Sequence, residues 1–184
     1  MTSRQSKSIQ RIVAAAVLAG GASAAQAGPF MGGDWAESVC QNWNQSETLT
    51  TELAGDDWAA NNGDKGYKVI QMYRNGCGGD TRVELNITAQ DGKAVCTYGG
   101  PAKTAALDDD VDYLMHASDE NWTCMGEGRF GCGAMGAMMS GKLQFAGPKM
   151  EAANVTEPFN AFLKLTGKVI GDESCPATGK TASR

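Results

Sequence analysis

Histidine and the usual nucleophile motifs are almost missing from this chain. His116 is the only histidine among 184 residues, and no Gly-x-Ser-x-Gly sequence occurs. Enzymes that activate a hydroxyl or thiol need a positioned base, which is most often histidine. A lone histidine on a strand is usually a surface residue or a satisfied core residue. The sequence therefore argues against an enzyme, and we expect no catalytic residues.

Motifs for metals and nucleotides are missing as well. No Cys-x-x-Cys pair occurs, and a single histidine adds little to a ligand set. The glycines of residues 131–136 spell a dinucleotide fingerprint, but no strand precedes them. Residues 136–142 spell most of a phosphate loop, but Leu143 follows in place of the Ser or Thr that binds magnesium. We expect no metal and no cofactor.

Long apolar runs are also absent. The run from Ile12 to Ala19 is too short to cross a bilayer, and no later segment is apolar enough to do so. Arg4, Lys7 and Arg11 precede this run and the small-x-small sequence Ala25-Gln26-Ala27 follows it, which is the pattern of a secretory signal peptide. We expect residues 1–27 to be this signal peptide and the protein to be periplasmic or secreted. No cysteine follows the cleavage site, so no lipid anchor is expected.

Positive charge is in deficit. Lys and Arg number 16 against 21 Asp and Glu, so the formal net charge is −5, and loss of the basic leader makes it more negative. An acidic domain does not bind nucleic acid through its overall field, so we expect no nucleic-acid partner. The remaining length fits one domain with a real core, over residues 28–171. The small, polar residues 172–184 are expected to form a loose tail.

Cysteine, in contrast, is well represented. The chain contains Cys40, Cys77, Cys96, Cys124, Cys132 and Cys175. An even number of cysteines in an exported chain indicates disulfides. Sequence proximity favours Cys124–Cys132. Cys77 and Cys96 fall at the ends of predicted neighbouring strands, and pairing them leaves Cys40 to join Cys175.

Alternating hydrophobicity predicts five strands, at residues 68–74, 81–88, 94–98, 111–117 and 142–146. The second is the clearest, because Val83, Leu85 and Ile87 share one face. Asp91-Gly92 predicts a hairpin turn after it. Helical patterns lie at both ends of this run of strands, starting near Asp34 (with a capping box to Glu37), Ser46, Asp119, Gly133, Pro148 and Thr156. This order predicts an α+β fold with a mostly antiparallel sheet.

Apolar side chains gather in the C-terminal half of the chain. Methionine, which is flexible and polarizable, recurs at Met125, Met135, Met138, Met139 and Met150. Phe159, Phe162 and Leu163 form an i, i+3, i+4 stripe on the last predicted helix, with Gly167 after its end. Such residues line an adaptable apolar cavity or fill a core, and both interpretations stay open.

The run from Met138 to Met150 resembles the signature of the sterol-carrier-protein-2-like family, in which Met-x-Gly-Lys-Leu-x-Phe/Ile-x-Gly lies on a strand before a Met/Leu-rich helix. Upstream, Val111 to Met115 resembles the family's fourth strand, and Asp119 to Trp122 resembles the short acidic helix after it. The resemblance covers roughly Tyr67 to Val169. This chain departs from the family's best-known members in its leader, its six cysteines and the interruption at residues 154–158.

The resemblance implies a five-stranded, mostly antiparallel sheet backed by helices that enclose an apolar tunnel. It implies binding of a sterol, fatty acid or phospholipid without cofactor or metal. The lining residues expected on this basis are Met115, Trp122, Met125, Met138, Met139, Leu143, Phe145, Met150, Phe159, Phe162 and Leu163.

The sequence thus predicts an exported lipid-binding protein that is able to transfer lipid, without a stable membrane anchor and with transient membrane contact left open. One alternative is a structural or accessory domain whose cavity is filled by its own side chains. A lipid-acting enzyme is a third alternative, and the shortage of histidine argues against it.

Overall fold

The computed structural model describes residues 28–55 and 58–178. The predicted signal peptide lies outside the described residues. Within them, no helix is long and apolar enough to cross a membrane.

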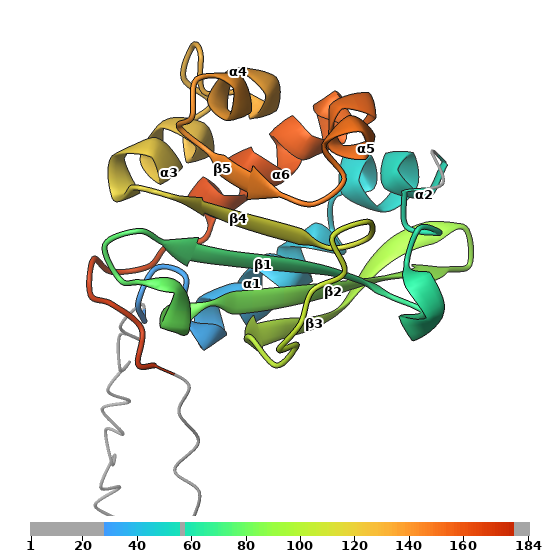
Figure 1. Cartoon of the computed structure of the whole chain (residues 1–184), viewed down its shortest axis with the longest axis horizontal. Coiled ribbons are helices and arrows are strands. Elements are labelled where there is room, and N and C mark those ends of the chain that lie inside the picture. The colour runs from blue at the N-terminus through green and yellow to red at the C-terminus, as the bar shows by residue number, and fades with distance from the viewer. Residues whose placement is uncertain (1–27, 56–57, 179–184) are drawn as a thin grey trace, which may run out of the picture.

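One five-stranded sheet forms the centre of the molecule (Figure 1). Its strands are β1 (Lys68–Arg74), β2 (Val83–Gln90), β3 (Lys93–Pro101), β4 (Tyr113–Ala117) and β5 (Gln144–Ala146). The spatial order is β3-β2-β1-β4-β5; β1 pairs with β4 in parallel and the other pairs are antiparallel. The predicted α+β class with a mostly antiparallel sheet is confirmed. Asp91 and Gly92 both have positive φ, as the predicted tight hairpin turn requires.

Helices cover one face of this sheet. They are α1 (Gly33–Trp43), α2 (Leu53–Gly55), α3 (Asp119–Gly126), α4 (Ala134–Met139), α5 (Lys149–Asn154) and α6 (Thr156–Lys168). A π-helical turn at Thr48–Glu52 leads into α2, and 3₁₀ turns lie at Gly63–Lys65 and Gly79–Thr81. Figure 1 shows α1 and α6 behind the sheet, while the segment that leaves β3 crosses the opposite face.

Helix α1 lies directly against β3. A Cβ atom on Gly99 would come within 2.3 Å of the carbonyl oxygen of Ala36, so only glycine permits this approach. A Cys40–Cys96 disulfide joins the same two elements. The predicted capping box at Asp34 is wrong, because Gly32 occupies the N-cap and no side chain caps the helix.

The helical structure is interrupted between α5 and α6, as the sequence predicted. Val155 has φ −108° and ψ 40°, so the helical hydrogen-bond pattern is interrupted there. The following helix continues through Gly167, which was expected to lie beyond its end. Glycine is required at position 167 because α6 packs closely on α3 there: a Cβ atom on Gly167 would lie 2.7 Å from the backbone of Gly126. Gly167 is therefore a helix–helix contact residue.

All six cysteines are paired, but only one of the predicted pairings is right. Cys124–Cys132 forms as expected. The other disulfides are Cys40–Cys96 and Cys77–Cys175, in place of the expected Cys77–Cys96 and Cys40–Cys175. The strand order explains the error. Cys77 follows β1 and Cys96 lies in β3, and β2 separates these two strands.

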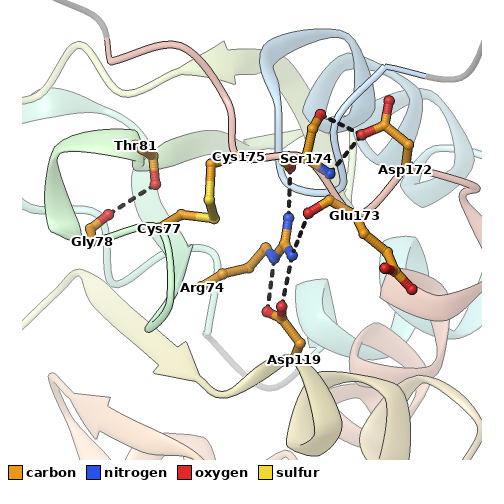
Figure 2. The surroundings of a disulfide bond; sticks show 9 residues. All are labelled: Arg74, Cys77, Gly78, Thr81, Asp119, Asp172, Glu173, Ser174 and Cys175. Atoms are coloured by element: carbon orange, nitrogen blue, oxygen red, sulfur yellow. Dashed lines mark hydrogen bonds and ion pairs between the residues drawn. A yellow bond between two sulfur atoms is a disulfide. The ribbon is translucent and has the colours of Figure 1, made fainter.

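The first residues of the expected loose tail are held in place (Figure 2). The guanidinium of Arg74 donates to the carbonyl oxygens of Glu173 at 3.0 Å and Ser174 at 2.8 Å. The backbone N–H of Asp172 donates to the carbonyl of Gly28. With the disulfide at Cys175, these contacts tie residues 172–175 to the domain, whereas the sequence predicted a loose tail over residues 172–184.

Candidate functional site

A small apolar pocket lies between the sheet and its helical cover. It is lined by Trp43, Leu53, Trp58, Ile70, Tyr113, Met115, Val155, Pro158, Phe159 and Phe162. These residues come from α1, α2, β1, β4 and α6 and from the segments before β1 and α6. The free volume is about 10 Å³, which is comparable to one water-sized probe. The open tunnel implied by the family resemblance therefore stays a prediction.

Aromatic rings occupy most of this interior. Trp43 meets Phe162 edge-on with ring centroids 5.6 Å apart, and it stacks on Trp58 at 6.2 Å. Tyr113 contacts Trp58 edge-on at 5.7 Å. Phe145 extends the cluster from β5, because its ring lies 4.9 Å from that of Tyr113. The pocket is thus a gap within an aromatic cluster.

One end of the pocket is polar. The indole N–H of Trp58 donates to the hydroxyl of Tyr113 at 2.7 Å, and this hydroxyl donates to Oε1 of Glu151 at 2.7 Å. Burial raises the pKa of the Tyr113 hydroxyl far above its ordinary value, and the nearby Glu151 carboxylate raises it further. Tyr113 therefore stays protonated and acts as a hydrogen-bond donor at neutral pH.

Lys68 completes this polar end. Its side chain is fully buried, and Nζ donates to Oε1 of Glu151 at 2.8 Å and to the carbonyl oxygen of Val111 at 2.6 Å. Nζ also lies 5.0 Å from the ring centroids of both Trp58 and Tyr113, within cation–π range. Burial lowers the pKa of the Lys68 ammonium, and Glu151 opposes this shift.

Asn61 holds the second oxygen of Glu151. Its Nδ2 atom donates to Oε2 at 2.6 Å, and the same amide donates to the carbonyl oxygen of Asp110 at 3.1 Å. The Glu151 side chain is 20% exposed, while that of Lys68 is not exposed at all. This carboxylate therefore stands between the buried ammonium and solvent.

The structure scatters the lining residues that the sequence predicted. Met115, Phe159 and Phe162 line the apolar pocket, and Phe145 contacts two of its rings. Trp122, Met125, Leu143 and Leu163 are buried outside it, and Met138 is half-buried. Met139 and Met150 are exposed, at 83% and 76%. The predicted methionine lining is thus represented in this pocket by Met115.

Sequence reasoning missed the residues that form the polar end. Lys68 stands two positions before Ile70 and therefore shares its face of β1. That spacing was the available signal for Lys68. No polar role was predicted for Tyr113, and Glu151 lies in a helix that the sequence predicted only from Pro148.

A larger hollow lies elsewhere but suits an apolar ligand less. It measures about 800 Å³ and runs between α1, the following π-helical turn and α6, with Asn42, Glu157, Asn160, Lys164 and Lys168 among its lining residues. Charged and amide side chains form much of its wall. Pockets that bind lipophilic molecules are mostly apolar, so we place the candidate site at the smaller interior pocket.

His116 lies away from this pocket. Its Nδ1 atom is 2.7 Å from the side-chain oxygen of Asn75, and its ring stacks on Tyr73 with centroids 4.5 Å apart. Burial lowers the pKa of His116, and Arg82 lowers it further. These contacts describe a satisfied structural histidine. Across residues 28–55 and 58–178, no His, Cys, Asp and Glu side chains are grouped as metal ligands.

Comparison with solved structures finds similar chains, among them sterol carrier proteins. A crystal structure of sterol carrier protein 2 shares 19% identity over 76% of this chain and 98% of its own, with a TM-score of 0.47. The chain is similar in fold to sterol carrier protein 2. A Thermus thermophilus protein whose name proposes a sterol carrier shares 20% over 81% of this chain and 97% of its own, with a TM-score of 0.49. Sterol carrier protein 2 of Yarrowia lipolytica shares 20% sequence identity over 71% of this chain and 88% of its own, with a TM-score of 0.39. No family model and no curated protein matches the sequence.

Proposed function

We propose that this protein binds a lipophilic small molecule between its sheet and helix α6, without catalysis. The observation that carries the proposal is the apolar pocket, whose wall is formed by aromatic and aliphatic side chains from both layers. Its one polar end holds hydrogen-bond donors and an ion pair. Apolar walls with a few convergent polar groups are the usual composition of a small-molecule site. The signature at Met138 to Met150 points to the same class of ligand.

Binding requires the pocket to widen. A ligand of lipid size needs several hundred Å³, against the present volume of about 10 Å³. The helix break at Val155 offers a place where α5 and the first turn of α6 can move away from β4. Phe159 and Phe162 would then exchange contacts with Trp43 and Tyr113 for contacts with the ligand. Burial of apolar ligand surface supplies about 25 cal/mol per Å² before ordering costs.

Met115, Phe145, Phe159 and Phe162 are the lining residues that this site supports best. Trp122, Met125, Met138, Met139, Leu143, Met150 and Leu163 would reach a ligand only in a wider opening of the helical layer, and their part in binding stays a proposal. We further propose that the protein is exported after loss of residues 1–27. Three disulfides are typical of a chain that folds in an oxidising compartment.

The second candidate is a structural or accessory domain with a self-filled interior. The small free volume of the pocket favours it directly. Rings whose centroids already lie 4.9–5.7 Å apart leave a ligand no site unless they separate. The two candidates differ in one measurable property, which is the uptake of an apolar molecule.

Organic extraction of the purified, folded protein followed by mass spectrometry tests the proposal. A sterol, fatty acid or phospholipid recovered in stoichiometric amount supports it. Titration of delipidated protein with the methyl ester of cis-parinaric acid, a fluorescent polyene, gives an independent reading. Absence of bound lipid together with absence of saturable fluorescence would favour the self-filled domain instead. N-terminal sequencing of the exported protein should begin at Gly28.

A further inference from the structure

The hydrogen-bond donors around Glu151 all come from outside the helix that carries this residue. Three donors converge on its carboxylate: the ammonium of Lys68, the hydroxyl of Tyr113 and the amide of Asn61, at 2.8, 2.7 and 2.6 Å. The donors belong to β1, β4 and the segment before β1. The acceptor alone comes from the short helix α5. If α5 moves, all three donors remain on the sheet side as a preformed site for a carboxylate.

This donor set lies at the end of the apolar pocket. Trp58 and Tyr113 line that pocket, and the same two rings flank Nζ of Lys68 at 5.0 Å. A molecule with an apolar chain in the pocket would therefore place its polar end beside Lys68. Glu151 is the more exposed partner of the ion pair and has a path to water, which Lys68 lacks.

The balance of charges around Lys68 favours a ligand with a carboxylate over one whose polar end is neutral. Two ion pairs lie here, Lys68–Glu151 and Lys65–Asp112. Asp112 is buried and also accepts from the backbone N–H groups of Val69 and Asp108, so it stays with its own partners. When Glu151 turns to solvent, the ammonium of Lys68 is left buried and unpaired, which is costly. A ligand carboxylate removes that cost, whereas a sterol hydroxyl or an ester does not.

We propose that Lys68, Tyr113 and Asn61 bind the carboxylate of a long-chain acid, and that Glu151 occupies this position as an internal substitute until the ligand displaces it. The inference rests on the proposed function and narrows it from lipophilic molecules in general to free acids with an apolar chain. No bond is made or broken, and the exchange replaces one carboxylate by another.

The test compares cis-parinaric acid with its methyl ester on wild-type protein and on two variants. Glu151→Gln removes the competing charge and keeps the side-chain shape, so the acid should bind about tenfold or more tightly while the ester changes little. Lys68→Met removes the ammonium, so affinity for the acid should fall about tenfold or more while the ester is unaffected. Lys149→Met and Glu157→Gln, at exposed positions on the neighbouring helices, are the matched controls.

The outcomes separate the inference from the proposed function. If neither probe binds wild-type protein, the lipid-binding function itself fails and the inference fails with it. If both probes bind and the variants change them equally, the function stands and the carboxylate site is refuted. If Lys68→Met does not fold, Glu151→Gln and Tyr113→Phe decide, because the first should favour the acid and the second should weaken it relative to the ester.

Discussion

Lys68 and Arg74 lie at the two ends of the same face of β1, and each is buried against a carboxylate from a different helix. Lys68 meets Glu151 of α5, and Arg74 meets Asp119 at the start of α3. Ile70 and Met72 lie between them on this face. The strand therefore carries an apolar centre with an ion pair at each end. One pair closes the pocket, while the other holds the C-terminal segment (Figure 2).

The ion pair at Arg74 makes a pH-dependent contribution to stability. The hydrogen bond from Arg74 lowers the pKa of the Asp119 carboxyl below its ordinary value. A carboxyl whose pKa is depressed on folding stabilises the protein above its unfolded pKa of about 3.9, and loses this contribution as the pH falls through the folded value. Asp119→Asn should therefore lower the unfolding temperature at pH 7, and the difference from wild type should shrink below about pH 4.

Thermal unfolding followed by circular dichroism between pH 2 and pH 7 measures this difference. Glu120→Gln is the control, because Glu120 is an exposed acid in the same first turn and shares the favourable helix-dipole position. A gap between Asp119→Asn and wild type that stays constant down to pH 2 would contradict the assignment.

The three disulfides should contribute unequally to stability. Cys77–Cys175 spans 98 residues and Cys124–Cys132 spans 8. Chain-entropy arguments give about 4–5 kcal/mol for the longer loop and about 2–3 kcal/mol for the shorter one. Replacing Cys77 and Cys175 together by Ser should therefore lower the free energy of unfolding more than the same change at Cys124 and Cys132. Guanidinium unfolding under non-reducing conditions tests the order, and equal losses would argue against it.

The hydroxyl of Tyr113 should be important for stability as well as for the polar end of the pocket. Tyr113→Phe leaves the buried indole N–H of Trp58 without its acceptor, at a cost of about 1–3 kcal/mol. Tyr98→Phe is the matched control, because the hydroxyl of Tyr98 donates to the carbonyl of Pro101 at an exposed position. That change should stay within about 0.5 kcal/mol. Denaturant unfolding of the two variants gives the comparison, and similar losses in both would refute a special role for Tyr113.

Local patterns predicted most of the elements. The alternation at Val83, Leu85 and Ile87 and the Asp91-Gly92 turn specify β2, its hairpin and the antiparallel pairing with β3. The non-local arrangement did not follow from such patterns. The parallel pairing of β1 with β4 brings together segments that are far apart in sequence, and β2 lies between β1 and β3. For that reason the pairing of Cys77 was mispredicted.

The polar end of the pocket could not be predicted for a related reason. A lysine in a strand is ordinarily read as exposed, because an unpaired buried ammonium is costly. Lys68 can be buried because its ammonium pairs with the carboxylate of Glu151, which lies 83 residues later in the sequence. The methionines that gather in the C-terminal half of the sequence are likewise not all in the interior. Met139 and Met150 lie at the surface, because their positions on α4 and α5 face away from the core.

The two candidate functions differ in how an added apolar ligand should affect the stability of wild type and of Phe162→Ala. Phe162 is 2% exposed and packs on Trp43 in the wall of the pocket, so the change should lower the free energy of unfolding by about 3–5 kcal/mol. In a lipid-binding protein the enlarged pocket should accept the methyl ester of cis-parinaric acid more readily. Added ester should then stabilise the variant more than it stabilises wild type.

Leu85→Ala supplies the control for this experiment. Leu85 in β2 is fully buried but does not line the pocket, so its replacement should cost about 2–5 kcal/mol without changing the response to the ester. Unfolding curves with and without ester for wild type, Phe162→Ala and Leu85→Ala give the necessary differences. If the ester stabilises none of them, the rings fill the interior for structural reasons and the self-filled domain is correct. If it stabilises Phe162→Ala alone, the pocket accepts a ligand only once it has been emptied, and the native protein is again a self-filled domain. Stabilisation of wild type, with a larger effect in Phe162→Ala and no increase in Leu85→Ala, is the result expected of a lipid-binding site at this position.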